Sequence, residues 1–317
     1  MGMPAVRPVV VIAAVVCLTA AAQDPKKDPG QIGSRDVSKG LNWYSIQQEA
    51  QLGKALAAQV MRTAKVVDDP IVSEYVNRVG QNLARNSDSK FPLTIHVLED
   101  DSINAMSLPG GYFFVNTGLI LTADTEAELA GGMAHEIAHI AARHATRQAT
   151  RAQAAQMATI PLIFIGGWPG FGTREAAGAL VPMSMMQFGR AFESEADMLG
   201  LEYLYKAGYD PNGMVNIFEK IAALTSQPGR VSKLFQTHPA TGDRVVAVQR
   251  EIQTLLQARP QYVVTTSEFN EVQARLRMIE NRRKGDAPDP HRPTLKRADQ
   301  KLAELPKFQP LDRRPSL

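Results

Sequence analysis

The sequence has 317 residues, a formal net charge of +3, 44% hydrophobic residues and 21% charged residues. A chain of this length can bury a substantial core in one or two domains. The small basic excess does not favour nucleic-acid binding. The sequence also contains no glycine-rich phosphate loop, dinucleotide-binding fingerprint or aromatic-plus-basic motif. We therefore expect no nucleic-acid partner.

The first 22 residues are typical of an export signal. Arg7 precedes the apolar run VVVIAAVVCLTAAA, and Ala20 and Ala22 form an A-x-A cleavage site. This run is shorter than the about 20 apolar residues that a membrane-spanning helix needs. We predict a signal peptide at residues 1–22 and an exported protein of the periplasm or envelope. An uncleaved membrane anchor is the alternative.

The single cysteine, Cys17, lies inside this signal segment. Cleavage leaves a mature chain without thiols, which excludes disulfides and cysteine nucleophiles and suits an oxidising compartment. Attachment of a lipid to Cys17 is a second interpretation. We favour it less because Val16 is bulky where a small residue is expected.

The mature chain divides by composition into three parts. Residues 23–40 are polar and rich in Gly and Pro, which predicts a flexible leader. Residues 41–260 are expected to form the folded domain, and residues 261–317 a C-terminal helix with a poorly ordered basic tail. The apolar segment 160–172 is too broken to span a bilayer, so we expect either a mobile flap beside a cleft or a buried loop.

Hydrophobic spacing and turn residues predict a mainly helical α+β domain. The elements expected in chain order are helices at about 43–64 and 70–86, a strand in PLTIHVLED, two strands of INAMSLPGGYFFVNTG joined at Pro109-Gly110-Gly111, a helix from about 124, a helix at about 187–207, and helices after Asp210 and after the THPATG loop.

The helix from about residue 124 carries most of the functional signal. Thr125 and Glu128 have the spacing of a capping box, and the alanine content allows the helix to run past residue 150. Gly131 and Gly132 lower its helix propensity. We therefore expect another backbone to approach closely there.

The sequence HEIAH in this helix predicts a metal site. His135 and His139 are four residues apart, on one helix face and about 6 Å from each other, so both can bind one ion. In an H-E-x-x-H motif zinc lowers the pKa of water, and the glutamate, here Glu136, accepts its proton during attack on a carbonyl. The alternative is a pair of packed or solvated histidines, because short motifs arise by chance in alanine-rich helices.

A catalytic zinc takes a third protein ligand and leaves one position for water. His144 is about half a turn out of phase with His135, so we expect it to face solvent. In FESEAD, Glu193 and Asp197 share a helix face, whereas Glu195 is about 200° round from Glu193. We assign Glu193 as the ligand and Asp197 as the carboxylate that holds a ligating histidine. A solvated acidic patch is the alternative.

The motifs together resemble a known family. HEIAH followed by ESEAD, with NAMSLPGGYFFVNTGLI before them and THP after them, is similar to the HtpX/BepA-like zinc metallopeptidases of peptidase family forty-eight. Their relatives include CAAX prenyl proteases and mitochondrial Oma-type proteases. The resemblance covers about residues 43–255. It implies a gluzincin-type fold with a small antiparallel sheet beside the HExxH helix, one zinc ion per chain and cleavage of polypeptides.

The resemblance implies that His135, His139 and Glu193 bind zinc and that Glu136 is the general base. It also implies that Asp197 holds a ligating histidine in place. This agrees with the assignment from spacing. Membrane-embedded relatives have transmembrane helices, whereas we expect none in this chain beyond the signal segment. This chain is therefore expected to belong to the exported, soluble branch. About 60 residues follow the matched motifs, so we expect no tetratricopeptide repeat domain of the kind that some relatives carry.

The strand pair and the THP loop provide further candidates. Proteases hold substrate as an extended strand on a sheet edge, and the resemblance places Asn104, Ala105 and Met106 nearest the metal. An ordinary core hairpin is the alternative. The resemblance also places His238 over the active site, where it either stabilises an oxyanion or binds zinc as a fourth ligand that keeps the enzyme latent. Otherwise His238 is polar surface. Arg244 either supports this loop through a carboxylate or is solvated.

These observations predict an exported zinc endopeptidase. By family resemblance its substrates are misfolded or unassembled envelope proteins, and peripheral association with a membrane or with envelope assembly machinery is a further expectation. Two other functions fit the sequence: a chaperone-like client-binding protein on a latent protease scaffold, and a zinc hydrolase that acts on something other than protein. The oligomeric state is not predicted.

Overall fold

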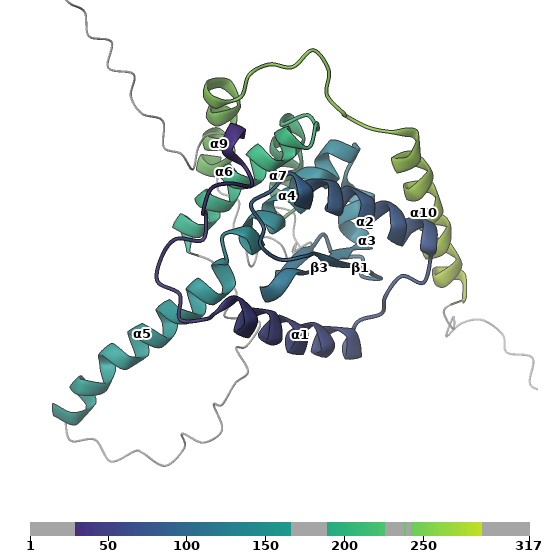
Figure 1. Ribbon diagram of the computed structural model, residues 1–317. Helices are drawn as coiled ribbons and strands as arrows, with labels where there is room; N and C mark the ends of the chain where they lie inside the picture. The colour runs from purple at the N-terminus through teal and green to yellow at the C-terminus, as the bar shows by residue number, and fades with distance from the viewer. Residues whose placement is uncertain (1–28, 166–188, 226–237, 239–241, 287–317) are drawn as a thin grey trace, which may run out of the picture. The chain divides into compact units, whose positions relative to one another are not determined.

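The computed structural model describes residues 29–165, 189–225, 238 and 242–286 (Figure 1). The predicted signal peptide, residues 166–172 of the predicted flap and the tail beyond Asp286 lie outside the described residues. The elements are η2 (Pro29–Gln31), α1 (Ile46–Thr63), α2 (Pro70–Arg85), β1 (Thr94–Leu98), β2 (Ala105–Leu108), η3 (Pro109–Gly111), β3 (Tyr112–Asn116), α3 (Thr117–Thr122), α4 (Glu126–Ala141), α5 (His144–Ile165), α6 (Arg190–Lys206), α7 (Asn212–Thr225), α9 (Gly242–Leu255) and α10 (Ser267–Asp286).

The first two predicted helices are confirmed as α1 and α2. Ser45 and Gln48 form a capping box at the start of α1, each side chain accepting from the other's backbone N–H. Asp69 caps α2 through the N–H of Val72, and Pro70 occupies its first turn. Helix α2 buries the apolar stripe that the spacing predicted. Local sequence was therefore sufficient for these two elements.

The sheet has three strands in the order β1-β3-β2. Strand β2 is antiparallel to β3, and the two are joined at η3 as predicted. Strand β1 is parallel to β3, so the sheet is mixed rather than antiparallel. Alternation along the sequence predicted each strand but carries no information about the direction of its partner. The α+β class, with a small sheet beside the HExxH helix, is confirmed.

Helix α4 is the centre of the core, and every one of its residues is buried. It packs against α6, α7, α2 and β2 (Figure 1). A Cβ added to Gly131 would lie 2.7 Å from the Cα of Met214 in α7, whereas one added to Gly132 would meet only the Leu119 side chain, at 3.7 Å. The expected close backbone approach is therefore confirmed at Gly131 and does not occur at Gly132.

These neighbouring glycines give a matched pair of substitutions. Gly131→Ala is expected to lower the free energy of unfolding by about 1–3 kcal/mol, because α7 backbone has to move away from α4. Gly132→Ala is expected to raise the free energy of unfolding by up to about 1 kcal/mol, because alanine favours helix and its Cβ would make only an ordinary van der Waals contact with Leu119. Chemical denaturation of both variants checks this. Equal effects would contradict the close packing of α4 on α7.

The alanine content allowed helix α4 to run past residue 150, but the helix is shorter. It ends at Ala141, and Arg143 adopts a left-handed backbone conformation with φ of 56° before α5 begins at His144. The Arg143 guanidinium donates to Glu49 Oε2 at 2.6 Å and to the Tyr44 carbonyl at 2.7 Å. These contacts to a distant part of the chain hold the break, so helix propensity alone gave the wrong result here.

Residues 29–40 also differ from the expected flexible leader, because several of them are buried. Ile32 and Val37 belong to the hydrophobic core. The buried guanidinium of Arg35 donates to Asp88 Oδ2 at 2.8 Å and also pairs with Glu202 of α6. A composition rich in Gly, Pro and charge predicted solvation, but the charge of Arg35 is balanced by two buried carboxylates that are remote in sequence.

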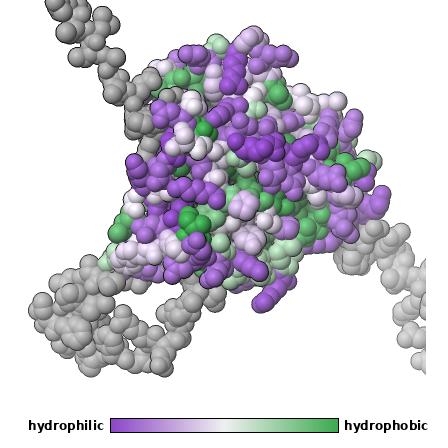
Figure 2. Space-filling model, viewed as in Figure 1, coloured by the Kyte–Doolittle hydropathy of each residue, from purple (hydrophilic) through white to green (hydrophobic). Residues whose placement is uncertain are grey.

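The described residues up to Leu276 belong to one compact unit, and those from Arg277 to a second. Phe269, Val272 and Leu276 of α10 are part of the core of the first unit. The domain boundaries expected from composition stay a prediction. Within the described ranges, no helix is both long enough and apolar enough to cross a membrane. The face in Figure 2 is largely hydrophilic, with smaller hydrophobic areas between.

Candidate metal centre

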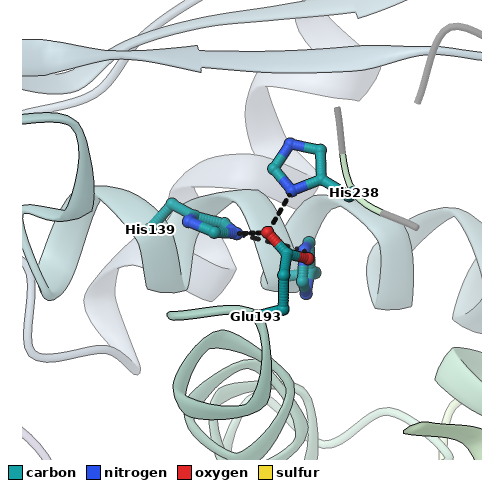
Figure 3. Close-up of side chains that lie close together, drawn as sticks. His139, Glu193 and His238 are labelled. Atoms are coloured by element: carbon teal, nitrogen blue, oxygen red, sulfur yellow. Dashed lines mark hydrogen bonds and ion pairs between the residues drawn. The ribbon is translucent and has the colours of Figure 1, made fainter. Parts of the chain in front are cut away.

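Four side chains that could hold a metal ion meet where α4 and α6 pack together. They are His135, His139, Glu193 and His238; all are buried, and one ligand atom of each lies within 4.8 Å of the others. Figure 3 shows the Glu193 carboxylate between the rings of His139 and His238. Residues from three separate segments of the chain thus converge on one point.

The distances among His135, His139 and Glu193 fit three ligands of one tetrahedral zinc ion. Zinc binds imidazole nitrogen at about 2.0–2.1 Å, which places neighbouring ligand atoms about 3.3 Å apart. The Nε2 atoms of His135 and His139 are 3.1 Å apart. Glu193 Oε2 lies 3.5 Å from His135 Nε2, and Glu193 Oε1 lies 3.6 Å from His139 Nε2. Nitrogen and carboxylate ligands in this arrangement are those that zinc takes at catalytic sites.

The outer nitrogen of His135 faces Asp197. His135 Nδ1 is 3.0 Å from Asp197 Oδ1, which leaves Nε2 directed at the cluster. Arg244 donates to both oxygens of Asp197 at 2.7 Å and lies 2.9 Å from Glu193 Oε2. Burial raises the pKa of the Asp197 carboxyl, but the hydrogen bonds from Arg244 and His135 outweigh this, so its pKa lies below the ordinary value. The structure therefore brings Arg244 to the carboxylates that were predicted for the site.

The proposed base, Glu136, is buried beside the cluster. Its Oε2 accepts from the Ser107 hydroxyl at 2.7 Å and from the Ser107 backbone N–H at 3.2 Å. Its Oε1 lies 3.4 Å from His238 Nε2. Ser107 was not predicted as a site residue, although it directly follows the three residues proposed to bind substrate.

Asn104 directly precedes β2, and Ala105 and Met106 are its first two residues, before Ser107. Asn104 accepts a hydrogen bond from the Asn116 N–H, so the backbone groups of Asn104 and Met106 face β3. The backbone groups of Ala105 and Ser107 face the other way by the same alternation. Since the Ser107 N–H reaches Glu136, the Ala105 N–H and C=O lie on the edge of the sheet next to the cluster.

His144 does not face solvent as expected, because the break at Arg143 changes its direction. It is fully buried, and its Nδ1 lies 2.9 Å from His139 Nδ1. Its Nε2 lies 3.2 Å from Glu195 Oε2. Neither His144 nor Glu195 was predicted as a site residue, because on one straight helix through residue 144 the His144 side chain would point away from His135.

Two histidines on one buried helix, a glutamate on a second and a carboxylate beside the first histidine define the site of an HExxH zinc metallopeptidase. Residues 70–252, more than half of the chain, match the model of peptidase family M48. The chain belongs to this family. The predicted family, metallopeptidase class and zinc cofactor are thereby confirmed.

Several characterised proteins are similar to this chain. The beta-barrel assembly-enhancing protease of Escherichia coli is 30% identical over 243 residues, which are 73% of this chain and 48% of that protein. The mitochondrial metalloendopeptidase OMA1 of Schizosaccharomyces pombe is 32% identical over 180 residues, 55% of this chain and 51% of that protein. The metalloprotease LoiP of Escherichia coli is 28% identical over 207 residues, 63% and 80% of the two chains. The alignment spans about half the length of the first two relatives.

Proposed function

We propose that this protein hydrolyses internal peptide bonds of polypeptides, with zinc held by His135, His139 and Glu193 and with Glu136 as general base. The observation that carries the proposal is the position of the Glu136 carboxylate. It is buried beside the ligand cluster and is held by Ser107 of an edge strand. One residue of β2 therefore connects the base to the strand on which a peptide would lie.

Zinc in this site supplies Lewis acidity, which acidifies water and polarises a carbonyl group. Glu136 accepts a proton from the water molecule while the water oxygen bonds to the carbonyl carbon of the scissile peptide. Glu136 then gives this proton to the amide nitrogen as the C–N bond breaks, which releases an amine and a carboxylic acid. The acid then loses its remaining proton to solvent and becomes a carboxylate. The two hydrogen bonds from Ser107 to Glu136 Oε2 orient the carboxylate for this proton transfer.

The edge of β2 is the proposed substrate-binding strand. An extended peptide can add to a sheet edge through main-chain hydrogen bonds, which would hold the scissile carbonyl near the metal. Ala105 offers its N–H and C=O at this edge, whereas Asn104 and Met106 direct theirs at β3. Among the three candidates, Ala105 is thus the one whose backbone would pair with the peptide.

We further propose that the substrates are misfolded or unassembled envelope proteins and that the protein works in the periplasm or envelope, after cleavage of residues 1–22. Two observations support this: the signal-like N-terminus and the similarity to proteins named beta-barrel assembly-enhancing protease. Peripheral association with a membrane or with envelope assembly machinery rests on the same similarity.

Cleavage of an unfolded protein tests the proposal against the chaperone alternative. The zinc-loaded chain and the same chain treated with a chelator are incubated with a reduced, unfolded protein, and fragments are identified by mass spectrometry. Zinc-dependent cuts at internal bonds support an endopeptidase. Binding of the unfolded protein with no cuts in either sample supports the chaperone, and turnover of small esters or amides alone supports a non-protein hydrolase.

His238 is the proposed fourth ligand that restrains activity. Its Nδ1 lies 2.8 Å from Glu193 Oε1, and its Nε2 lies 3.4 Å from Glu136 Oε1, so the ring contacts both the proposed ligand and the proposed base. His238→Ala is expected to raise the rate of peptide cleavage on the order of 10-fold, equivalent to about 1.4 kcal/mol. Steady-state kinetics at equal zinc occupancy measure this. A fall in kcat would instead assign His238 to oxyanion stabilisation.

A further inference from the structure

Three carboxylates follow one another at alternate positions in α6, and two of them already have places in the site. Glu193 belongs to the ligand cluster and Asp197 faces His135. The third, Glu195, contacts His144 at 3.2 Å and Arg147 at 3.1 Å. His139, the second histidine of the motif, therefore has a histidine, His144, beside the ring nitrogen that faces away from the cluster.

We infer that His144 and Glu195 are positioning residues, which hold the ring of His139 in the orientation that zinc requires. The inference rests on the zinc site proposed above. The hydrogen-bond chain runs from His139 Nδ1 to His144 Nδ1 at 2.9 Å, and from His144 Nε2 to Glu195 Oε2 at 3.2 Å. It parallels the contact of His135 with Asp197 on the other side of the cluster.

The direction of each hydrogen bond in this chain follows from the one before it. His139 presents Nε2 to the cluster, so a neutral ring that binds metal there carries its proton on Nδ1. That proton is donated to His144 Nδ1, which must then be an acceptor. The proton of His144 is consequently on Nε2, where it is donated to the Glu195 carboxylate. One assignment of protons satisfies all three side chains.

The surroundings of His144 hold it in place. Its ring stacks on Phe192, with centroids 4.5 Å apart and an interplanar angle of 26°. The Arg147 guanidinium lies 4.8 Å from the centroid of the same Phe192 ring and balances the charge of Glu195. The left-handed residue Arg143 turns the chain so that His144 points back at α4. These contacts give His144 the rigid packing that an outer partner of a metal ligand needs.

Two substitutions of His144 separate positioning from packing. His144→Leu removes the acceptor of the proposed hydrogen bond from His139. We expect the zinc Kd to rise about 10–100-fold, as is usual when the hydrogen-bond partner of a metal ligand is removed. His144→Asn keeps an acceptor oxygen near the position of Nδ1, and its Kd is expected to stay within about 10-fold of wild type, below that of the leucine variant. Glu126→Gln is the matched control, because Glu126 is a buried carboxylate of α4 that bonds Tyr209 rather than the site.

The zinc Kd of the full chain and its variants is measured by chelator competition, with thermal unfolding of the zinc-free forms as the measure of folding. The inference is overturned if His144→Leu binds zinc as tightly as His144→Asn or wild type. Absence of zinc binding by the wild type would instead overturn the zinc site itself.

A second measurement does not depend on whether the leucine variant folds. In the zinc-loaded wild-type chain, nitrogen-15 NMR of labelled histidine reports which ring nitrogens carry protons. We expect a protonated Nδ1 on His139 and a protonated Nε2 on His144. A proton on Nδ1 of His144 would exclude the proposed hydrogen-bond chain.

Discussion

Glu136→Gln is expected to reduce peptide cleavage by about 10²–10⁴-fold, the range associated with loss of a general base. The glutamine amide has the size of the carboxylate and can still accept from Ser107, so the fold and the zinc Kd should stay unchanged. It cannot accept a proton from water. The measurement is kcat/KM for an unfolded protein or a derived peptide, at equal zinc occupancy of both forms.

The control for this substitution is Glu126→Gln, the same chemical change in the same helix. Glu126 is about 20 Å along α4 from His139 at 1.5 Å per residue, so its replacement is expected to leave kcat/KM unchanged. Equal activity of the wild type and Glu136→Gln would rule out the mechanism and point to a contaminating protease.

Glu193→Ala is expected to raise the zinc Kd by more than about 100-fold. This exceeds the effect of removing a residue that only hydrogen-bonds to a metal ligand, because Glu193 is itself a proposed ligand. It also removes the group that faces both His135 and His139. Zinc at about 1,000 times its Kd adds about 4 kcal/mol to the free energy of unfolding of a protein that binds it in the folded state. A chelator should therefore lower the Tm of the wild type by several degrees and leave that of Glu193→Ala unchanged.

Glu202→Gln provides the matched control in α6. Glu202 is buried in the same helix, but it pairs with Arg35 rather than with the ligand cluster. This variant should keep the chelator-induced fall in Tm, whatever its own stability. The same fall in Glu193→Ala as in the wild type would show that zinc binds elsewhere.

Features that depend on neighbouring residues were predictable. The cap at Thr125 was predicted from a spacing of three residues, and its side chain accepts from the Glu128 N–H. The caps at Ser45 and Asp69 are equally local. The pairs His135/His139 and Glu193/Asp197 were placed on helix faces by their four-residue spacing. The order of the motifs predicted the family, but the spacing within a helix could not show which part of the chain completes each contact.

Features that depend on distant partners were not predictable from spacing. Arg143 ends α4 because its side chain meets Glu49, 94 residues away. His144 is buried because Glu195, 51 residues away, and the ring of Phe192 enclose it. Arg35 is ordered by Asp88 and Glu202. In each case a polar residue that composition places in solvent has a partner, remote in the chain, of opposite charge or of matching hydrogen-bonding capacity.

The sequence by itself predicted the class of protein and the metal through the order and identity of its motifs. It also predicted the residues that bind the metal, because helical periodicity places residues four positions apart on one face. Only the tertiary structure decided what surrounds these residues. It placed Ser107 against Glu136, the proposed base, Arg244 against Asp197, and His144 with Glu195 next to His139. The physical reason is that their positions depend on helix breaks, strand pairing and buried charges, which arise from contacts between segments remote in the chain.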